Sequence, residues 1–177
     1  YVPDPKAKGL DVLCAGWAAA GLGHGARLAV YGLDRGWARE HLRRAGVPEP
    51  PGVEWPGIVP APEFRAALRR ARAYVGGARW EDFGQAPLEA LADGALLATV
   101  PSGGPFEALA LARELDPALV AGSLAPADLG AAVRAAFELP DERVRAYRRR
   151  AAELLAAYRP EAVQAVVGER VLPALLG

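Results

Sequence analysis

Two carboxylates beside a glycine are the residues of this sequence whose types and spacing most suggest chemistry. Glu81 and Glu89 stand eight positions apart, with Gly84 between them. A helix predicted to start near Gln85 would direct its unpaired N–H groups at the preceding loop, which suits a phosphate. Glu89 could accept hydrogen bonds from both hydroxyls of a ribose, and Glu81 could accept them from sugar hydroxyls. The alternative is that both acids only complement the helix dipole.

A second glycine-rich turn, residues 102–107, follows the clearest predicted strand, 95–100. Its two glycines and its proline favour a tight strand-to-helix connection with free N–H groups. The same residues would fit a turn without a ligand, with Gly104 as the N-cap and Glu107 at the third helical position. Residues 21–26 imitate a dinucleotide fingerprint, but they follow a helix and precede a strand, so we interpret them as a flexible turn.

These turns belong to an alternation of helices and strands. Apolar strands separated by helices of about ten residues predict a parallel sheet covered on both faces. Ligands of such sheets bind beyond the carboxyl ends of the strands, where both turns would lie. We expect one α/β domain over residues 1–177, with a doubly wound sheet. The predicted helices are 9–20, 36–45, 62–73, 87–93, 105–115, 127–138, 141–158 and 161–176, and the strands are 27–31, 53–55, 74–76, 95–100 and 118–121.

Composition narrows the class of protein. Hydrophobic residues make up 52% of the 177 residues, and 21 basic residues balance 21 acidic ones, which favours a buried core and argues against nucleic-acid binding. One cysteine, Cys14, and two histidines give neither a disulfide framework nor a metal cluster. No apolar run reaches the roughly 20 residues of a membrane span, and no signal peptide opens the sequence, so we expect a cytoplasmic protein.

Two further features concern the source and the surface. The absence of Met and the scarcity of thermolabile side chains are compatible with a thermophile, and the start at Tyr1 suggests a piece of a longer protein. The arginine runs at 43–44, 69–70 and 148–150 are interpreted as solvated helix faces rather than as a membrane patch.

Taken together, these segments resemble the C-terminal, donor-binding domain of retaining glycosyltransferases of the GT-B fold, in the broad family 4. The family's Lys-Gly near the domain start looks like that at 8–9, its strand ending in Gly looks like 28–32, and its Val-x-x-x-Gly segment is similar to 53–57. Its hallmark Glu-Gly-Phe-Gly-x-x-x-x-Glu-Ala is similar to residues 81–90, and its Gly-Gly-x-x-Glu is similar to 103–107. The resemblance covers nearly the whole chain and implies a Rossmann-like domain, one half of such an enzyme.

The resemblance also implies a role for each matching residue. Lys8 would neutralise the donor diphosphate, Glu81 would be the carboxylate at the catalytic centre that holds the transferred sugar, and Glu89 would bind the ribose. The loop at Gly57 and Ile58 would lie near the base. The remaining donor-binding residues would be Phe83, Gly84, Gln85, Ala86, Gly103 and Gly104. The family implies no metal and no cofactor, only a substrate such as a UDP-, GDP- or ADP-hexose.

Three positions depart from the family pattern. The family usually places an Arg about five residues before the Lys, a position that falls here near Pro3. Asp82 replaces a glycine of the hallmark, and residues 99–102 also differ. Since the first two departures would weaken donor binding, two alternatives stay open: a catalytically degenerate scaffold or regulatory domain, and another nucleotide-binding Rossmann-like domain.

The expected function is therefore transfer of a hexosyl group to an unknown acceptor. The expected partners are the nucleotide-sugar donor and an acceptor-binding N-terminal domain of the same enzyme, so this fragment alone would be inactive. No nucleic acid and no transmembrane segment are expected, although the full enzyme could associate peripherally with a membrane. The apolar face of helix 161–176 is expected to be exposed or to be covered by a neighbour.

Overall fold

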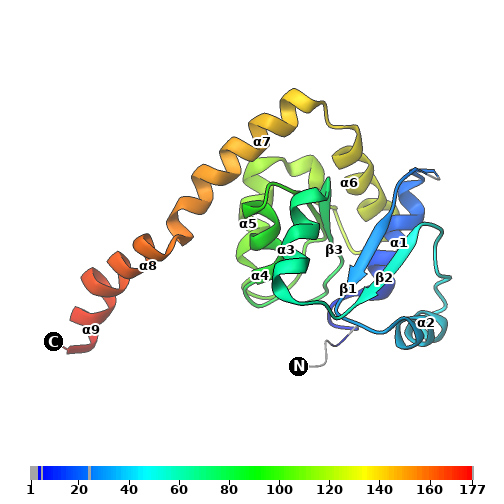
Figure 1. The fold of residues 1–177 in the computed structure, drawn as a ribbon, viewed down its shortest axis with the longest axis horizontal. Coiled ribbons are helices and arrows are strands. Elements are labelled where there is room, and N and C mark those ends of the chain that lie inside the picture. The colour runs from blue at the N-terminus through cyan, green and yellow to red at the C-terminus, as the bar shows by residue number, and fades with distance from the viewer. Residues whose placement is uncertain (1–3, 5, 24, 177) are drawn as a thin grey trace.

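The computed structural model of this chain describes residues 4, 6–23 and 25–176. Helices and strands alternate along it, as expected (Figure 1). Short 3₁₀ turns at Pro117–Leu119 and Leu155–Tyr158 and a π turn at Val167–Val171 interrupt the second half. The helices are α1 Leu10–Ala20, α2 Arg35–Arg44, α3 Ala61–Arg70, α4 Gln85–Ala92, α5 Glu107–Leu115, α6 Pro126–Glu138, α7 Asp141–Leu154, α8 Pro160–Val166 and α9 Leu172–Leu176; the strands are β1 Leu28–Tyr31, β2 Val53–Gly57, β3 Ala73–Gly76 and β4 Leu96–Thr99.

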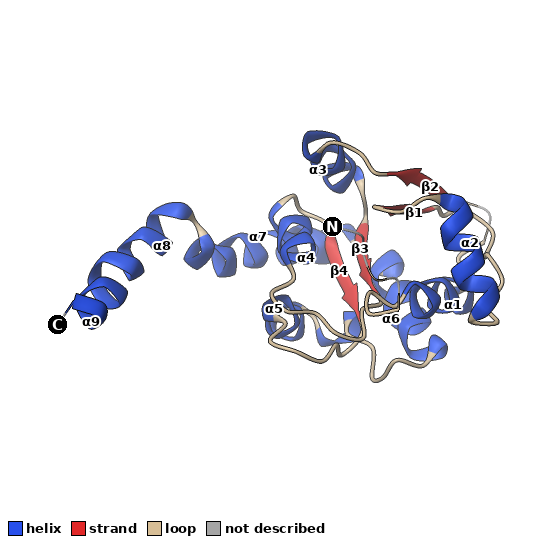
Figure 2. Ribbon diagram, turned by 90° about the horizontal axis from the view of Figure 1, so that it is seen from below, coloured by secondary structure: helices blue, strands red, loops and turns tan. Residues whose placement is uncertain are grey.

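The strands form two parallel ladders, β1 with β2 and β3 with β4. The β3–β4 ladder is regular from Ala73 opposite Leu96 to Gly76 opposite Thr99. Helices α1 and α6 lie on one side of β3 and β4, and α4 and α5 lie on the other (Figure 2). The parallel α/β arrangement with helices on both faces is confirmed. It is built from two ladders, and no backbone hydrogen bond between them is found in the described ranges.

Several predicted elements differ from the structure. Residues 118–121 are not a regular strand, because Asp116 accepts a hydrogen bond from the Ala118 N–H at 3.1 Å and starts a 3₁₀ turn; only a single bridge joins Val120 to Thr99. The helix predicted over 62–73 ends at Arg70, and the chain is extended from Ala71 onward. Helix α5 starts at Glu107 with Phe106 as its N-cap, so Gly104 lies in the loop and not at the cap.

The core lies between β4 and the helices on either side of it. All four residues of β4 are buried, and Leu119, Leu129 and Val133 pack in the same cluster at 0% exposure. Helix α1 can approach α6 closely because Gly16 and Gly130 lack a Cβ. A Cβ at Gly16 would lie 2.6 Å from the Leu129 side chain, and one at Gly130 would lie 2.8 Å from the Ala19 backbone. This packing fixes the position of α1.

The start of α1 is held against the loop that follows β3. Gly9 has φ +62°, and a Cβ there would lie 1.8 Å from the carbonyl oxygen of Gly77. The Arg79 N–H donates to the Ala7 carbonyl at 2.9 Å, and the Arg79 guanidinium donates to the Asp11 carboxylate at 2.7 and 2.6 Å. Those hydrogen bonds hold the pKa of Asp11 below its usual value. Two segments far apart in sequence are thereby locked together.

The last helices extend away from the rest of the structure (Figure 1). The Tyr158 hydroxyl, at the end of the 3₁₀ turn after α7, donates to Glu107 and so joins this turn to α5. Beyond it, the apolar side chains are exposed, as expected for part of this face: Val163, Val166, Val167, Val171, Leu172, Leu175 and Leu176. Among the described residues, no helix is long and apolar enough to cross a membrane.

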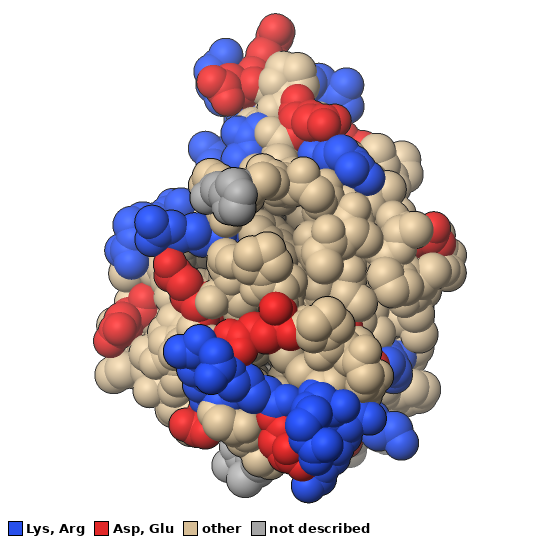
Figure 3. Space-filling view, turned by 90° about the vertical axis from the view of Figure 1, so that its right-hand side faces the viewer, with Lys and Arg blue, Asp and Glu red and all other residues tan. Residues whose placement is uncertain are grey.

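Most arginines of the three runs are paired with acids or carbonyls. Arg43 and Arg44 both donate to Glu40, and Arg150 donates to Glu114 and Glu153. Figure 3, which views the side of the molecule where α2 lies, shows basic and acidic side chains intermixed. All arginines of the three runs are exposed on helix surfaces, as the sequence indicated.

Replacing Arg72 should lower stability measurably. Its guanidinium donates to the carbonyls of Ala136 (3.2 Å), Phe137 (3.3 Å) and Leu139, at the end of α6, where carbonyls lack helical partners. Arg72→Met should cost about 2 kcal/mol and lower the Tm by about 4–8 °C in calorimetry. Arg70→Met, at the exposed neighbour, is the control; equal losses in both variants would contradict the capping role.

The close approach of Gly9 to Gly77 can be separated from backbone strain. Gly9→Ala combines a left-handed φ with a clash against backbone, whereas Gly23→Ala has a similar φ of +75° and nothing within 4 Å. The Gly23 variant should lose about 1–2 kcal/mol by chemical denaturation, and the Gly9 variant clearly more. If the two lose the same amount, the contact is not as tight as described.

Candidate functional site

Lys8 and Glu81 meet at the carboxyl end of β3. The Lys8 ammonium donates to both Glu81 carboxylate oxygens, at 2.9 and 2.8 Å, although the residues are 73 positions apart. The Glu81 side chain is 15% exposed and that of Lys8 44%, so the pair lies at the surface with the carboxylate more enclosed. The structure thus brings together two of the residues that the sequence singled out.

The loop carrying Glu81 is fastened to the glycine-rich turn after β4. The Glu81 N–H donates to the Gly103 carbonyl at 3.0 Å, and the Gly103 N–H donates to the Arg79 carbonyl at 3.0 Å. Gly104 has φ +88°, and a Cβ there would lie 2.5 Å from the Glu81 carbonyl oxygen. The expectation that both glycines offer free N–H groups is therefore wrong for Gly103. Its N–H is used to hold the Glu81 loop.

Helix α4 begins beside this pair. Gly84 is its N-cap at φ +80°, and a Cβ there would lie 2.5 Å from the Phe106 ring. Within the part of the chain that the structure describes, no acceptor is found for the N–H groups of Phe83, Gly84, Gln85 and Ala86. Unpaired N–H groups at a helix start, together with its dipole, favour an anion.

Asp82, which the sequence marked as an unfavourable charge, has a partner. Its carboxylate accepts a hydrogen bond from the Trp80 indole N–H at 2.8 Å. Trp80 is 56% exposed and Phe83 is 53% exposed, so two aromatic side chains lie at the surface on either side of Asp82. No signal in the sequence spacing predicted the Trp80–Asp82 contact.

Glu89 lies farther along α4 and faces a different hollow from Glu81. Its carboxylate accepts from the Gln85 amide at 3.3 Å and lies 3.9 Å from the Arg65 guanidinium. Arg65 also makes a two-pronged contact with Asp93, which lowers the pKa of that carboxyl. Phe83, Gln85 and Glu89 line a cavity of about 560 Å³ between α4 and residues 152–163.

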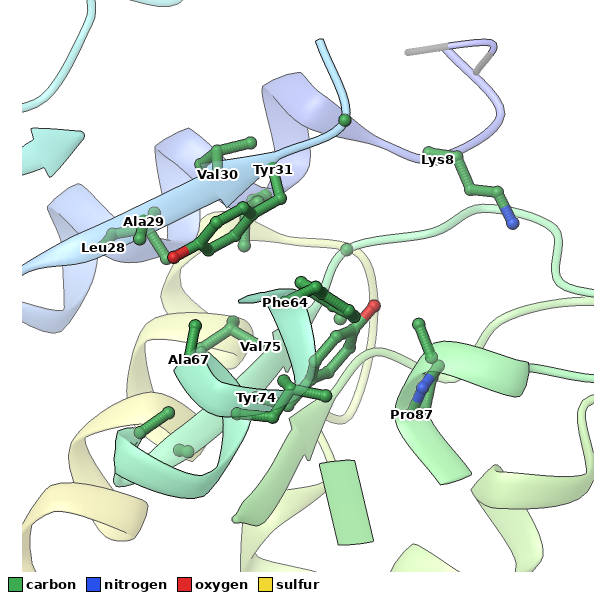
Figure 4. Close-up of a pocket in the computed structure, with 18 of the residues that line it drawn as sticks. Lys8, Leu28, Ala29, Val30, Tyr31, Phe64, Ala67, Tyr74, Val75 and Pro87 are labelled. Carbon is green, nitrogen blue, oxygen red and sulfur yellow. The ribbon is translucent and has the colours of Figure 1, made fainter. Parts of the chain in front are cut away.

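A larger cavity of about 1000 Å³ opens on the other side of α4. Lys8, Glu81, Ala86 and Ile58 contribute to its lining, and Ile58 is 83% exposed. Figure 4 shows that most of its wall comes from β1, α3 and β3. Tyr31 and Phe64 meet edge to face there with ring centroids 5.3 Å apart, and burial raises the pKa of Tyr74 to about 12.

The sequence analysis did not identify Arg65 and Arg79 as residues of the site. Arg79 and Arg65 act through contacts with Asp11, Asp93 and Glu89, which come from distant segments. The position of Arg79 two residues after Gly76-Gly77 in the loop was the one signal that could have marked it. The arginine expected by the family pattern would fall at Pro3, outside the described residues. Over the described ranges, no group of three or more His, Cys, Asp or Glu residues could hold a metal ion.

Comparisons with known proteins agree with this architecture. The sequence matches the family profile described as glycosyl transferases group 1 over residues 2–139. The crystal structure of the catalytic domain of cholesterol-alpha-glucosyltransferase from Helicobacter pylori is similar in fold, with a TM-score of 0.65 and 23% identity over 84% of this chain and 90% of that chain. Sucrose-phosphate synthase from Thermosynechococcus elongatus is 22% identical over 88% of this chain and 42% of that chain, with a TM-score of 0.44. No curated protein sequence matches significantly.

The expected fold, a Rossmann-like domain of a GT-B glycosyltransferase, is confirmed by the first of these structures. The family match spans well over half of the chain. The chain therefore belongs to the glycosyl transferases group 1 family.

Proposed function

We propose that this chain binds the nucleotide-sugar donor of a retaining hexosyltransferase. The observation that carries the proposal is the contact of Lys8 with Glu81 beside the start of α4. Among the residues that the structure describes, the Lys8 ammonium, a row of N–H groups without an acceptor and an enclosed carboxylate come together in one loop cluster. This combination offers a diphosphate its counter-charges and offers a sugar a hydroxyl acceptor.

The diphosphate fits between Lys8 and α4. The two contacts to Glu81 use at most two of the three N–H donors of the Lys8 ammonium, so one remains for a phosphate oxygen. The N–H groups of residues 83–86 stand at the start of α4 without an acceptor among the described residues, and the partial positive charge of a helix N-terminus is about +0.5. The Lys8 side chain and the start of α4 together would offset the diphosphate charge without a metal ion.

The two carboxylates would take hydroxyl groups rather than phosphates. A carboxylate repels a diphosphate by about 4 kcal/mol for each pair of unit charges at 4 Å and an effective dielectric constant of 20. Hydroxyl groups instead donate to it. We assign the transferred sugar to Glu81 and the ribose to Glu89, with the diphosphate between them at the start of α4. The exposed Ile58 would lie near the base.

The reaction is transfer of the glycosyl group from diphosphate to an acceptor hydroxyl with retained anomeric configuration. The bond between the anomeric carbon and the diphosphate oxygen breaks, and the diphosphate leaves with the electron pair. The acceptor oxygen would bond to the anomeric carbon and give its proton to the leaving phosphate oxygen. Lys8 and the N–H groups of residues 83–86 would stabilise that growing charge. Glu81 is a positioning acceptor for the sugar and not a nucleophile. An acceptor site on an N-terminal domain of the same enzyme would complete the centre, so this chain alone should bind donor without transferring sugar.

Titration calorimetry with UDP-, GDP- and ADP-glucose tests the proposal. One nucleotide sugar should bind with a 1:1 stoichiometry, and the matching nucleoside diphosphate should compete with it. If none of the three binds at millimolar concentration, the chain is not a donor-binding domain.

Lys8→Gln should weaken binding of the nucleoside diphosphate at least tenfold. The variant removes a charge-assisted hydrogen bond to phosphate, worth roughly 1.5–3 kcal/mol. Lys6→Gln is the matched control, since Lys6 is exposed in the same turn and contributes its backbone carbonyl to Arg79. Calorimetry should find the control within about twofold of the parent; equal losses in both variants would point to general charge attraction and against a Lys8 contact.

Glu89→Gln should also reduce nucleotide affinity about tenfold or more while the fold survives. The change keeps the shape and one acceptor but removes the charge that strengthens hydrogen bonds from ribose hydroxyls. Glu114→Gln, which alters another surface carboxylate paired with an arginine, is the control. If calorimetry shows that Glu89→Gln binds nucleoside diphosphates as tightly as the parent, Glu89 is structural and the ribose lies elsewhere.

A further inference from the structure

Helix α3 packs beside α4, and next to this contact the two helices face each other with polar side chains. Leu68 of α3 and Ala90 of α4 are buried together in one small apolar cluster. Residues four positions apart lie on the same face of a helix, so each helix presents a row of side chains to the other. The rows are Arg65 and Arg69 on α3, and Gln85, Glu89 and Asp93 on α4 and its C-cap.

Arg65 is anchored at one end of these rows by Asp93. Its Nε and Nη2 donate to the two carboxylate oxygens of Asp93, the second at 2.9 Å. The Asp93 side chain is only 8% exposed, so this anchor is largely shielded from water. Because a guanidinium is planar, two contacts to one carboxylate fix the direction of its third nitrogen. That nitrogen, Nη1, lies 3.9 Å from Oε1 of Glu89.

The two oxygens of Glu89 have different surroundings. Oε1 accepts a hydrogen bond from the Gln85 amide at 3.3 Å and is the oxygen that Arg65 approaches. For Oε2, no donor is found among the described residues. The side chain is 30% exposed and lines the cavity of about 560 Å³. The protein thus holds one oxygen of Glu89 and leaves the other to a ligand.

Holding the carboxylate in this way favours binding. A long side chain that becomes ordered only when its ligand arrives reduces affinity by about two- to tenfold. Gln85 alone is a weak restraint on Glu89, because a neutral contact between residues four apart on a helix contributes little. The charged Arg65, which is itself fixed by Asp93, is the stronger restraint.

We propose that Arg65 is a positioning residue for the ribose of the donor, and this role rests on the proposed function. Anchored on Asp93, it holds Glu89 in the orientation in which Oε2 accepts from the ribose hydroxyls. Arg65 does not itself touch the nucleotide. Its effect on affinity therefore requires both the Glu89 carboxylate and the ribose hydroxyls.

Titration calorimetry with two kinds of nucleotide tests the proposal. The probes are whichever of UDP, GDP and ADP binds the parent chain, and its 2′,3′-dideoxy counterpart, which offers Glu89 no hydroxyl group. The parent should prefer the ribonucleotide about tenfold or more, because charge-assisted hydrogen bonds are lost with the hydroxyls. Arg65→Met should lower this preference about threefold or more by weakening the ribonucleotide, and should leave the dideoxynucleotide within about twofold.

Two further variants separate positioning from structural support. Arg69→Met is the matched control, since Arg69 lies 3.5 Å from the same Asp93 carboxylate and has no contact with Glu89 among the described residues. It should keep the parent's preference within about twofold. Arg65→Lys keeps a charge near Asp93 but lacks the planar fork, so it should lose the preference as Arg65→Met does. Partial unfolding does not imitate this loss, because both nucleotides bind the same folded fraction and their ratio is unchanged.

A double variant completes the test. With Glu89→Gln already present, Arg65→Met should change the preference by less than about twofold, because the arginine acts through the carboxylate. The proposal is overturned if Arg65→Met keeps the parent's preference, if Arg69→Met loses as much, or if Arg65→Met has the same effect in both backgrounds.

Failure of the proposed function would look different. A parent chain that binds none of the three nucleotides overturns the donor-binding function and this role with it. A parent that binds ribonucleotide and dideoxynucleotide equally overturns the ribose contact of Glu89, and again this role. Only binding with a preference that is independent of Arg65 leaves the donor site in place and removes the positioning residue alone.

Discussion

The close approach of two glycines, Gly9 and Gly77, is the constraint on which the candidate site depends. Without a Cβ on either residue, the backbone before α1 can lie against the backbone after β3. The Arg79 N–H then reaches the Ala7 carbonyl, and the Arg79 guanidinium reaches Asp11. Lys8 lies between these fixed points and meets Glu81 as a consequence. Lys8, the only cation in contact with Glu81 among the described residues, is thus positioned by backbone packing, and its own contact adds little to the fold.

The charges around α4 follow a simple pattern. Each acid near the proposed diphosphate position has a donor already in contact or close by: Lys8 for Glu81, the Trp80 indole for Asp82, and Gln85 with the more distant Arg65 for Glu89. Repulsion of an incoming anion is reduced in this way. The N–H groups at the start of α4 have no such partner in the described residues and stay available to an anion.

Local patterns in the sequence account for much of this arrangement. Apolar runs and glycines located most of the strands, and a helix start near Gln85 was expected from the sequence. The structure adds that Gly84 is the N-cap of α4, where its left-handed φ suits a glycine. Other features depend on partners far away in sequence. Residues 118–121 carry strand-like side chains, but the Asp116 cap and a single bridge decide their conformation. The Arg65 and Arg79 contacts and the gap between the ladders likewise arise only when distant segments meet, so no local pattern could reveal them.

A crystal structure of the chain with its nucleotide sugar would test the central claim, that backbone packing at Gly9 and Gly77 assembles the donor site. The account predicts the diphosphate against the Lys8 ammonium and the N–H groups of residues 83–86, with sugar hydroxyls on Glu81 and the ribose at Glu89. A nucleotide seated between β1 and β3, or on any surface that leaves Lys8 and the start of α4 without contact, would contradict it.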